Sequence, residues 1–253
     1  MREPAIILEH VSKTYRLSHQ PYSSLKGMLL SMFRYRRRVE LHPALQDVTL
    51  TISRGETVGL IGVNGSGKST LLAIIARVIR PSAGRVEVNG RVAPLLQLGV
   101  GFHPDLTGLE NVYFNAIILG LTRQQVAERL PSIVRFAELE EFIDTPIRAY
   151  SSGMVLRLGF AVAVHTDPEI ILMDEVLAVG DEAFQHKCLR KIQEFQREGR
   201  TILLVSHDMN QVRQVASRVV WLHQGRVVAD GETEEVVSQY LAFAAHREKG
   251  ASW

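Results

Sequence analysis

A glycine-rich run in the first third of the chain has the residue types of a phosphate-binding loop. Residues 62–70 read GVNGSGKST, which fits the pattern G-x-x-x-x-G-K-[ST]. In such a loop the glycines let backbone amides face the phosphates, Lys68 reaches the β- and γ-phosphates, and the Ser69 hydroxyl coordinates Mg²⁺. The pattern arises by chance in only about 1% of chains of this length. We therefore expect phosphate and Mg²⁺ binding here, through Gly62, Asn64, Gly65, Ser66, Gly67, Lys68, Ser69 and Thr70.

Two carboxylates follow the apolar segment 170–173. Asp174, at the end of this predicted strand, is placed to hold Mg²⁺, and Glu175 is placed to orient or deprotonate an attacking water. A strand followed by a polar turn would by itself explain such a pair, but together with the loop the catalytic interpretation is favoured. His207 follows the next apolar segment, 201–205, and is predicted to contact the γ-phosphate from the same edge of a parallel sheet.

These motifs require a sheet whose strands end at one edge, and the hydropathy pattern predicts it. Apolar runs alternate with amphipathic segments, which is typical of a mostly parallel sheet with helices on both faces. Strands are predicted at 5–11, 44–52, 56–61, 85–88, 91–96, 170–173, 201–205, 219–222 and 226–228, and helices at 69–79, 153–165, 183–197, 211–216 and from Thr233 onward. Thr107 with Glu110 and Thr122 with Gln125 have capping-box spacing, so each threonine should start a helix. Pro131 is expected to kink or divide the second of these.

The composition indicates a large globular domain. Of 253 residues 46% are hydrophobic and 22% are charged, which excludes a disordered chain. The single cysteine, Cys188, has no partner for an internal disulfide and is expected to pack in the core. No run approaches the roughly 18 apolar residues of a transmembrane helix, and the N-terminus lacks a signal-peptide layout. We therefore expect a soluble protein in a reducing cytosol.

The basic residues are concentrated near the N-terminus. The net charge is +2, but seven Lys and Arg residues and no acidic residue lie between Glu9 and Glu40, so the remainder carries −5. Such a local excess argues against a nucleic-acid-binding surface over the whole molecule. Apolar residues at i, i+3, i+4 spacing predict a helix here, with Tyr22, Leu25, Met28, Leu29, Met32 and Phe33 on one face and Arg34, Arg36, Arg37 and Arg38 at its end. This helix could contact anionic lipid or a membrane subunit, or it could fold onto its own domain.

Taken in chain order, the motifs resemble the nucleotide-binding subunit of ABC transporters. The distinguishing element is YSSGM at 150–154, which is similar to the family signature L-S-G-G-Q and precedes Asp174 as the family order requires. The resemblance implies an ATP hydrolase with a P-loop NTPase α/β fold: a mixed, mostly parallel sheet, an antiparallel β part and an inserted helical subdomain. It also implies that Tyr15 ends the first strand and stacks on adenine, and that Gln97 reaches Mg²⁺ and the attacking water. Further ATP contacts implied by it are Ser151, Ser152, Gly153 and Asp181.

The signature departs from the family pattern at Tyr150, Ser152 and Met154. Because its function rests on a serine hydroxyl and on amides at a helix N-terminus, Ser151 and Gly153 should suffice. The chain also resembles a narrower group, the ATPases that export lipid-linked polysaccharides such as O-antigen and teichoic acid. The similarity lies in this signature variant, in residues 99–110 and 178–181, and in the extra sequence after Tyr15.

The resemblance to the ABC family implies a homodimer that binds ATP between one copy's Lys68 and the other copy's Ser151. The narrower resemblance implies two copies of a membrane permease, a lipid-linked polysaccharide as cargo, no nucleic acid, and a peripheral place on the cytoplasmic face of the membrane. The expected plan is one domain over 1–253, with an inserted basic segment at about 16–43, a helical subdomain at about 102–165 and a C-terminal helix and tail at about 231–253. A soluble non-transport ABC ATPase and a nutrient-importer ATPase are the alternatives.

Overall fold

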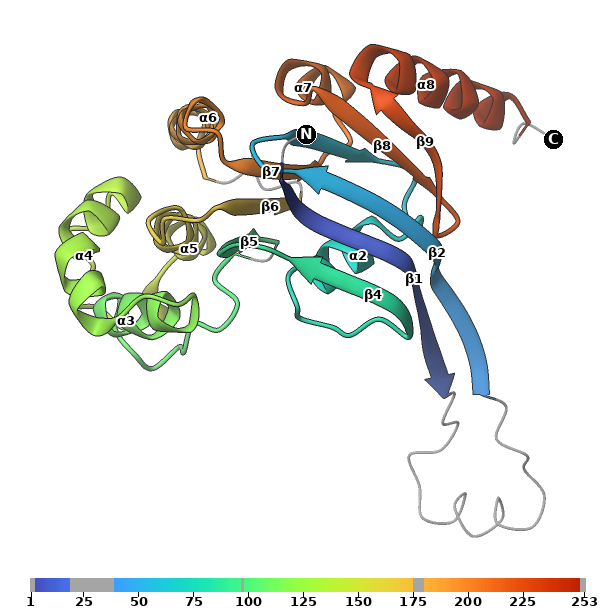
Figure 1. Cartoon of the computed structure of the whole chain (residues 1–253). Coiled ribbons are helices and arrows are strands. Elements are labelled where there is room, and N and C mark those ends of the chain that lie inside the picture. Colours follow the sequence, from blue (N-terminus) through green and yellow to red (C-terminus); the bar gives the residue numbers. More distant parts are fainter. Residues whose placement is uncertain (1–2, 19–38, 97, 175–179, 251–253) are drawn as a thin grey trace, which may run out of the picture.

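The computed structural model describes residues 3–18, 39–96, 98–174 and 180–250 (Figure 1). In this part of the chain, two sheets and the helices around them form the α/β architecture that the sequence predicts. The predicted basic helix within 22–38 lies outside the described residues, as do Gln97 and Glu175.

The larger sheet supplies the edge at which the predicted motifs meet. Its six described strands lie in the order β5-β6-β7-β3-β8-β9. Their bounds are β3 Thr57–Ile61, β5 Val92–Leu95, β6 Ile170–Asp174, β7 Thr201–Val205, β8 Arg218–His223 and β9 Arg226–Glu232. All pairs are parallel except β8 with β9, which is antiparallel. Every residue of β3 and β7 is buried, because both faces of the sheet are covered.

Different helices cover the two faces of this sheet. On one face, Leu60 and Leu172 pack with α2 (Lys68–Ile75) and with the smaller sheet. On the other, Ile171 and Leu204 pack with α5 (Ser152–Val164) and α6 (Glu182–Arg197), and Val219 packs with α7 (Met209–Val215) and α8 (Thr233–Gly250). The division follows from strand geometry, since neighbouring side chains such as those of residues 171 and 172 point to opposite faces.

The single cysteine of the chain lies in this core. Cys188 of α6 is fully buried there, which confirms the packing interpretation. The burial raises the pKa of its thiol to about 12. Among the described residues, no helix combines the length and the apolar character that crossing a bilayer would require.

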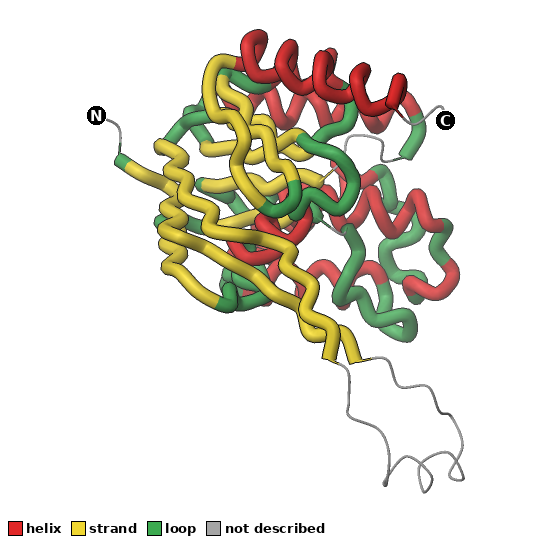
Figure 2. The backbone as a smooth tube through the Cα atoms, turned by 90° about the vertical axis from the view of Figure 1, so that its right-hand side faces the viewer, coloured by secondary structure: helices red, strands yellow, loops and turns green. Residues whose placement is uncertain are grey.

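The smaller sheet, in the order β2-β1-β4, is antiparallel and carries two unusually long strands. The strands are β1 Pro4–Ser18, β2 Val39–Ser53 and β4 Ala83–Val88. The β1–β2 register continues to the pair Ser18–Val39, so the strands do not end near residues 11, 15 and 44 as the sequence predicts. Residues 14–18 and 39–43, here called the hairpin arm, project beyond the rest of the molecule (Figure 2). Both ends of the segment expected at about 16–43 are therefore strand, because pairing satisfies their backbone groups.

The helical subdomain lies at one end of the larger sheet (Figure 1). It contains α3 (Gly108–Ile118), α4 (Arg123–Ala137), the 3₁₀ helix η1 (Ile147–Ala149) and α5. Both predicted capping boxes are present, at Thr107 with Glu110 and at Thr122 with Gln125. The hydrogen bonds from the Thr107 amide and hydroxyl also lower the pKa of the Glu110 carboxyl.

Pro131 does not divide the second of these helices, so of the two predicted effects, a kink or a division, the division is wrong. α4 runs without a break from Arg123 to Ala137 with Pro131 inside it. Val126 before the proline and Ile133 after it are both fully buried in the same apolar cluster. Packing on both sides of Pro131 therefore offsets the backbone hydrogen bond that the proline removes.

Candidate functional site

The loop between β3 and α2 is shaped by glycines that no other residue could replace without strain. Gly67 caps α2 with φ 106°, and a Cβ atom there would lie 2.5 Å from the carbonyl oxygen of Ala44. Gly62 has φ 148°, and its Cβ would lie 2.2 Å from the carbonyl oxygen of Leu222. Backbone from two distant strands thus approaches the loop closely. This close approach fixes the path of the loop in front of the helix N-terminus, where anions are favoured.

Lys68 is held across this loop. Its side chain is buried, and Nζ donates hydrogen bonds to the carbonyl oxygens of Gly62 at 2.6 Å and Val63 at 3.1 Å. A buried ammonium needs such partners, because an unpaired charge in the interior is costly. The contacts place a positive charge at the centre of the loop, where the sequence predicts the β- and γ-phosphates.

Ser69 and Asp174 meet beside Lys68. The hydroxyl of Ser69, in the first turn of α2, donates to Asp174 Oδ2 at 2.9 Å. Asp174 is the last residue of β6, as the sequence predicts. Hydroxyl and carboxylate oxygens suit Mg²⁺, which binds through few protein ligands together with substrate phosphates. Within the described residues there is no group of three or more His, Cys, Asp or Glu side chains that would form a metal cage.

A hollow of about 240 Å³ brings most of the predicted residues together. It is lined by Tyr15, His42, Ala44, Asn64, Gly65, Gly67, Lys68, Ser69, Thr70, Asp174 and His207. Two predicted residues, Gly62 and Ser66, shape the loop without lining the hollow, and Ser66 is only 1% exposed. Sequence reasoning missed His42. The pairing of β1 with β2, the two strands that flank the insertion, brings His42 to the hollow, and no motif in the sequence marks it.

Tyr15 stands at one wall of this hollow. It lies inside β1 and not at its end, and 37% of its surface is exposed. Lys13 Nζ lies 5.3 Å from the centroid of the Tyr15 ring and donates to the carbonyl oxygen of Arg80 at 2.7 Å. Lys13 itself does not line the hollow. The aromatic ring is thus supported by a cation while part of it remains accessible to a ligand.

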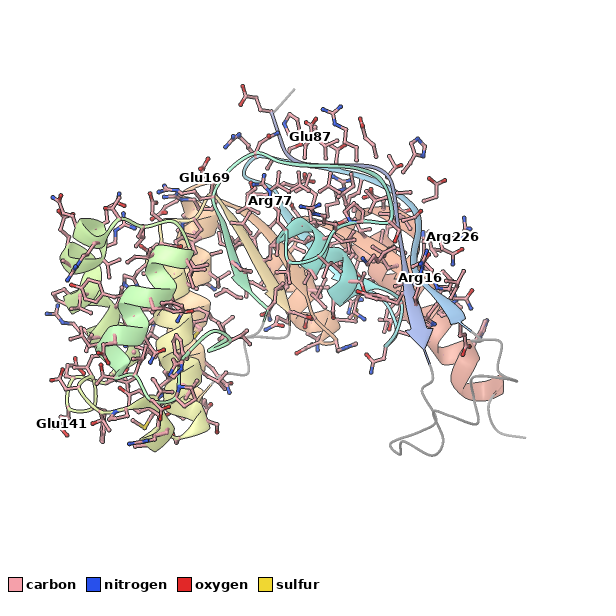
Figure 3. The ribbon with its side chains drawn as sticks, turned by 90° about the horizontal axis from the view of Figure 1, so that it is seen from below. Arg16, Arg77, Glu87, Glu141, Glu169 and Arg226 are labelled. Carbon is pink, nitrogen blue, oxygen red and sulfur yellow. The ribbon has the colours of Figure 1, made fainter. Side chains whose placement is uncertain are left out.

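The signature residues lie in the helical subdomain and do not line the hollow. Ser151 caps α5 and its hydroxyl accepts a hydrogen bond from the Met154 amide at 3.2 Å. Ser151 and Ser152 are exposed, and Gly153 has only the Ser151 hydroxyl within 4 Å of a would-be Cβ. Figure 3 shows the helical subdomain, labelled at Glu141, on the side of the molecule away from Arg16 of the hairpin arm.

Tyr150 has a structural role. Its hydroxyl donates to the carbonyl oxygen of Phe142 at 2.7 Å and lies where a side chain at Gly108 would otherwise stand. Burial, together with the nearby Asp144 carboxylate, raises the pKa of the phenol. The tyrosine that departs from the family signature therefore ties the start of α5 to the preceding loop.

Asp181 is also outside the hollow. It caps α6 by accepting a hydrogen bond from the Phe184 amide at 2.9 Å, and its other oxygen pairs with the guanidinium of Arg157. Arg157 comes from α5, three residues beyond Met154, and stacks over the Phe184 ring at 5.2 Å. Sequence reasoning did not identify Arg157, because only the fold brings α5 beside α6.

Comparison with known proteins gives consistent results. Residues 45–178 match the family described as ABC transporter. An O-antigen export system ATP-binding protein, RfbB of Klebsiella pneumoniae, is 47% identical over 94% of this chain and 98% of its own length. A teichoic acids export ATP-binding protein, TagH of Listeria innocua, is 43% identical over 94% of this chain and 70% of its own length. A dimeric ATP-binding cassette in a post-hydrolysis state, bound to ADP and Pi, shares 26% identity with a TM-score of 0.71, covering 90% of this chain and 98% of that one.

Proposed function

Since the chain belongs to the ABC transporter family, we propose that it is the ATP-hydrolysing subunit that powers export of a lipid-linked polysaccharide across the cytoplasmic membrane. The cargo would be of the O-antigen or teichoic-acid type, as the names of its relatives suggest. The single observation that carries the ATPase part is the meeting of Lys68, Ser69 and Asp174 at one hollow.

The described residues fit ATP with Mg²⁺. Lys68 would neutralise the β- and γ-phosphates, while Ser69 and Asp174 would hold Mg²⁺ against them, with Gln97 as a further ligand. When bound, Mg²⁺ supplies charge neutralisation at the phosphates. We assign His207, which lines the hollow, to the γ-phosphate, and Glu175, which follows Asp174 in the sequence, to orienting or deprotonating the attacking water.

We propose that the site is completed by a second copy of the chain. Ser151, Ser152, Gly153 and Asp181 do not line the hollow of their own chain, although the resemblance assigns all four to ATP. Contact across two copies reconciles these observations, and one similar structure is described as dimeric. A trans contact in other NTPases accelerates hydrolysis about 10³- to 10⁵-fold, so a single copy should hydrolyse ATP slowly.

A separate integral-membrane permease, in two copies, is the proposed second partner. The chain would then act at the cytoplasmic face of the membrane as a peripheral subunit.

We also propose that 1–253 is one nucleotide-binding domain whose helical subdomain spans about 102–165 and whose C-terminal helix and tail span about 231–253. The predicted basic helix within 22–38, in the inserted segment at about 16–43, would contact lipid or the permease.

The transporter assignment is tested by recovering the tagged chain from detergent-solubilised source membranes. We expect an integral membrane protein to copurify in a fixed ratio with the wild type and not with the tag alone. Recovery of the chain by itself, or with ribosomes or nucleic acid, would instead favour a soluble ABC ATPase.

The dimer is tested separately with Glu175→Gln. Removing the carboxylate should slow hydrolysis and leave ATP bound between two copies, so this variant is expected to elute as a dimer with ATP and Mg²⁺. Elution as a monomer under those conditions would contradict the shared site.

A further inference from the structure

His42 shares one wall of the hollow with Tyr15. The two residues are directly opposed in the β1–β2 register. Side chains of opposed residues in an antiparallel pair lie on the same face, with Cβ atoms about 4.5–5.5 Å apart. Both residues line the hollow, and both are exposed. The hairpin arm thus presents an aromatic ring and an imidazole side by side to the same space.

A β-bulge at Ala44 directs His42 to this face. Lys13 pairs with Leu45 and Thr14 with Pro43, so Ala44 is an extra residue on β2. Ala44 and Leu45 are both buried, which places two successive side chains on one face and shifts the alternation that follows. Without the extra residue, His42 would point away from Tyr15.

The same bulge fixes the arm to the phosphate loop. The carbonyl oxygen of Ala44 lies 2.5 Å from a would-be Cβ at Gly67 and 2.7 Å from one at Gly225, so both glycines accommodate it. In addition, the Gln46 amide donates to the carbonyl oxygen of Gly225 at 2.8 Å. The position of His42 relative to the loop is therefore determined by backbone contacts on both sides of β2.

We infer that His42 is a second nucleoside-binding residue, which contacts the base or its ribose beside Tyr15, the residue that the resemblance already assigns to adenine; this rests on the proposed function. The phosphates are assigned to other residues of the same hollow, Lys68 and Ser69 at the start of α2. Imidazole offers a flat face for stacking and a ring nitrogen for hydrogen bonding. The arm otherwise brings only the Tyr15 ring to the hollow, so His42 would supply its nitrogen-bearing contact.

The test compares His42→Ala with Leu41→Ala by calorimetric titration in the presence of Mg²⁺. Leu41 is the neighbouring arm residue, is 60% exposed and does not line the hollow, so its replacement controls for damage to the arm. The ligands are ATP, ADP and inorganic tripolyphosphate, which carries phosphates without a nucleoside. An aromatic contact is worth about 0.5–1.5 kcal/mol, which corresponds to a change of about 2- to 12-fold in Kd.

For His42→Ala we expect the Kd values of ATP and ADP to rise by one common factor in this range, and that of tripolyphosphate to stay constant. Leu41→Ala should match the wild type, and His42→Phe, which keeps a stacking face, should recover part of the loss. Unchanged ATP affinity in His42→Ala would overturn the inference. An equal loss of tripolyphosphate affinity would also overturn it, because His42 would then act on phosphate. A wild-type chain that binds no ATP would instead refute the proposed function.

Discussion

Ser69 Oγ donates a 2.9 Å hydrogen bond to Asp174 Oδ2 across a sequence separation of 105 residues. This contact joins the N-terminus of α2 to the carboxyl end of β6, which lies two strands away from β3 in the larger sheet. Parallel strands end at a common edge, so residues far apart in the chain come together there. An oxygen pair suited to Mg²⁺ is therefore assembled by the sheet itself.

The first prediction concerns this pair. Asp174→Asn keeps an oxygen acceptor for Ser69 but removes the negative charge. We expect Mg²⁺ to bind about 10- to 100-fold more weakly, so that the Mg²⁺ concentration at the half-maximal rate of ATP hydrolysis rises by that factor, with little change in thermal stability. Asp105→Asn, at an exposed residue of the helical subdomain, is the control. An unchanged Mg²⁺ requirement would argue against a role for Asp174 in holding the metal.

The second prediction concerns Gly67→Ala. The new Cβ would clash with the carbonyl oxygen of Ala44 at 2.5 Å, and φ 106° would add backbone strain. We expect a loss of about 1–3 kcal/mol in the free energy of unfolding, measured in urea, together with loss of ATP binding. Gly120→Ala has φ 99° but nothing within 4 Å, so it introduces strain without a clash. That control should cost less and leave ATP binding intact; equal behaviour of the two variants would disprove the clash.

The third prediction concerns the contact between Arg157 and Asp181. Arg157→Met keeps an apolar side chain against Phe184 but removes the ion pair with Asp181. Since neither residue lines the hollow, ATP binding to a single chain should be unchanged. If Asp181 acts across the dimer, hydrolysis should fall severalfold, as measured by phosphate release.

Arg148→Met provides the matched control for that experiment. Arg148 pairs with Asp105 at the surface of the same subdomain, where both side chains are largely exposed, so the pair should contribute little to stability. Its replacement is expected to leave hydrolysis at the wild-type rate. If Arg157→Met also hydrolyses ATP at that rate, positioning of Asp181 by Arg157 is excluded.

The fourth prediction concerns pH and His165. Burial, with the nearby charges of Lys191 and Arg129, lowers the pKa of His165 below its ordinary value of 6.5, while its Nδ1 contacts the carbonyl oxygen of Ala161 at 2.7 Å. The unfolded chain therefore takes up a proton at a higher pH than the folded chain does. The contribution of neutral His165 to the free energy of unfolding is therefore fully present above pH 6.5, and it is lost as the pH falls toward the pKa of His165 in the folded state.

Urea unfolding at pH 7.5 and 5.5 measures this effect. The wild type should lose more stability between the two conditions than His165→Gln, which cannot take up the proton. His186→Gln, at a histidine of α6 whose side chain is 65% exposed, should lose as much as the wild type. An equal loss in His165→Gln and the wild type would show that other groups carry the pH dependence.

The sequence by itself determined the features that depend on residues close together in the chain. The phosphate loop at 62–70, the carboxylate at the end of 170–174 and both capping boxes could all be predicted, since each needs certain residue types within a few positions. The alternation of strands and helices likewise predicted the parallel sheet and the edge at which Lys68, Asp174 and His207 meet.

Only the tertiary structure decided features that depend on a partner far along the chain. β1 and β2 extend to Ser18 and Val39 because each satisfies the other's backbone, and the bulge at Ala44 brings His42 beside Tyr15. α4 passes through Pro131 because buried residues on both sides hold it. Asp181 meets Arg157 because α5 and α6 lie together on one face of the sheet. Local patterns carry no information on such contacts, since packing and strand register arise only once distant segments are brought together.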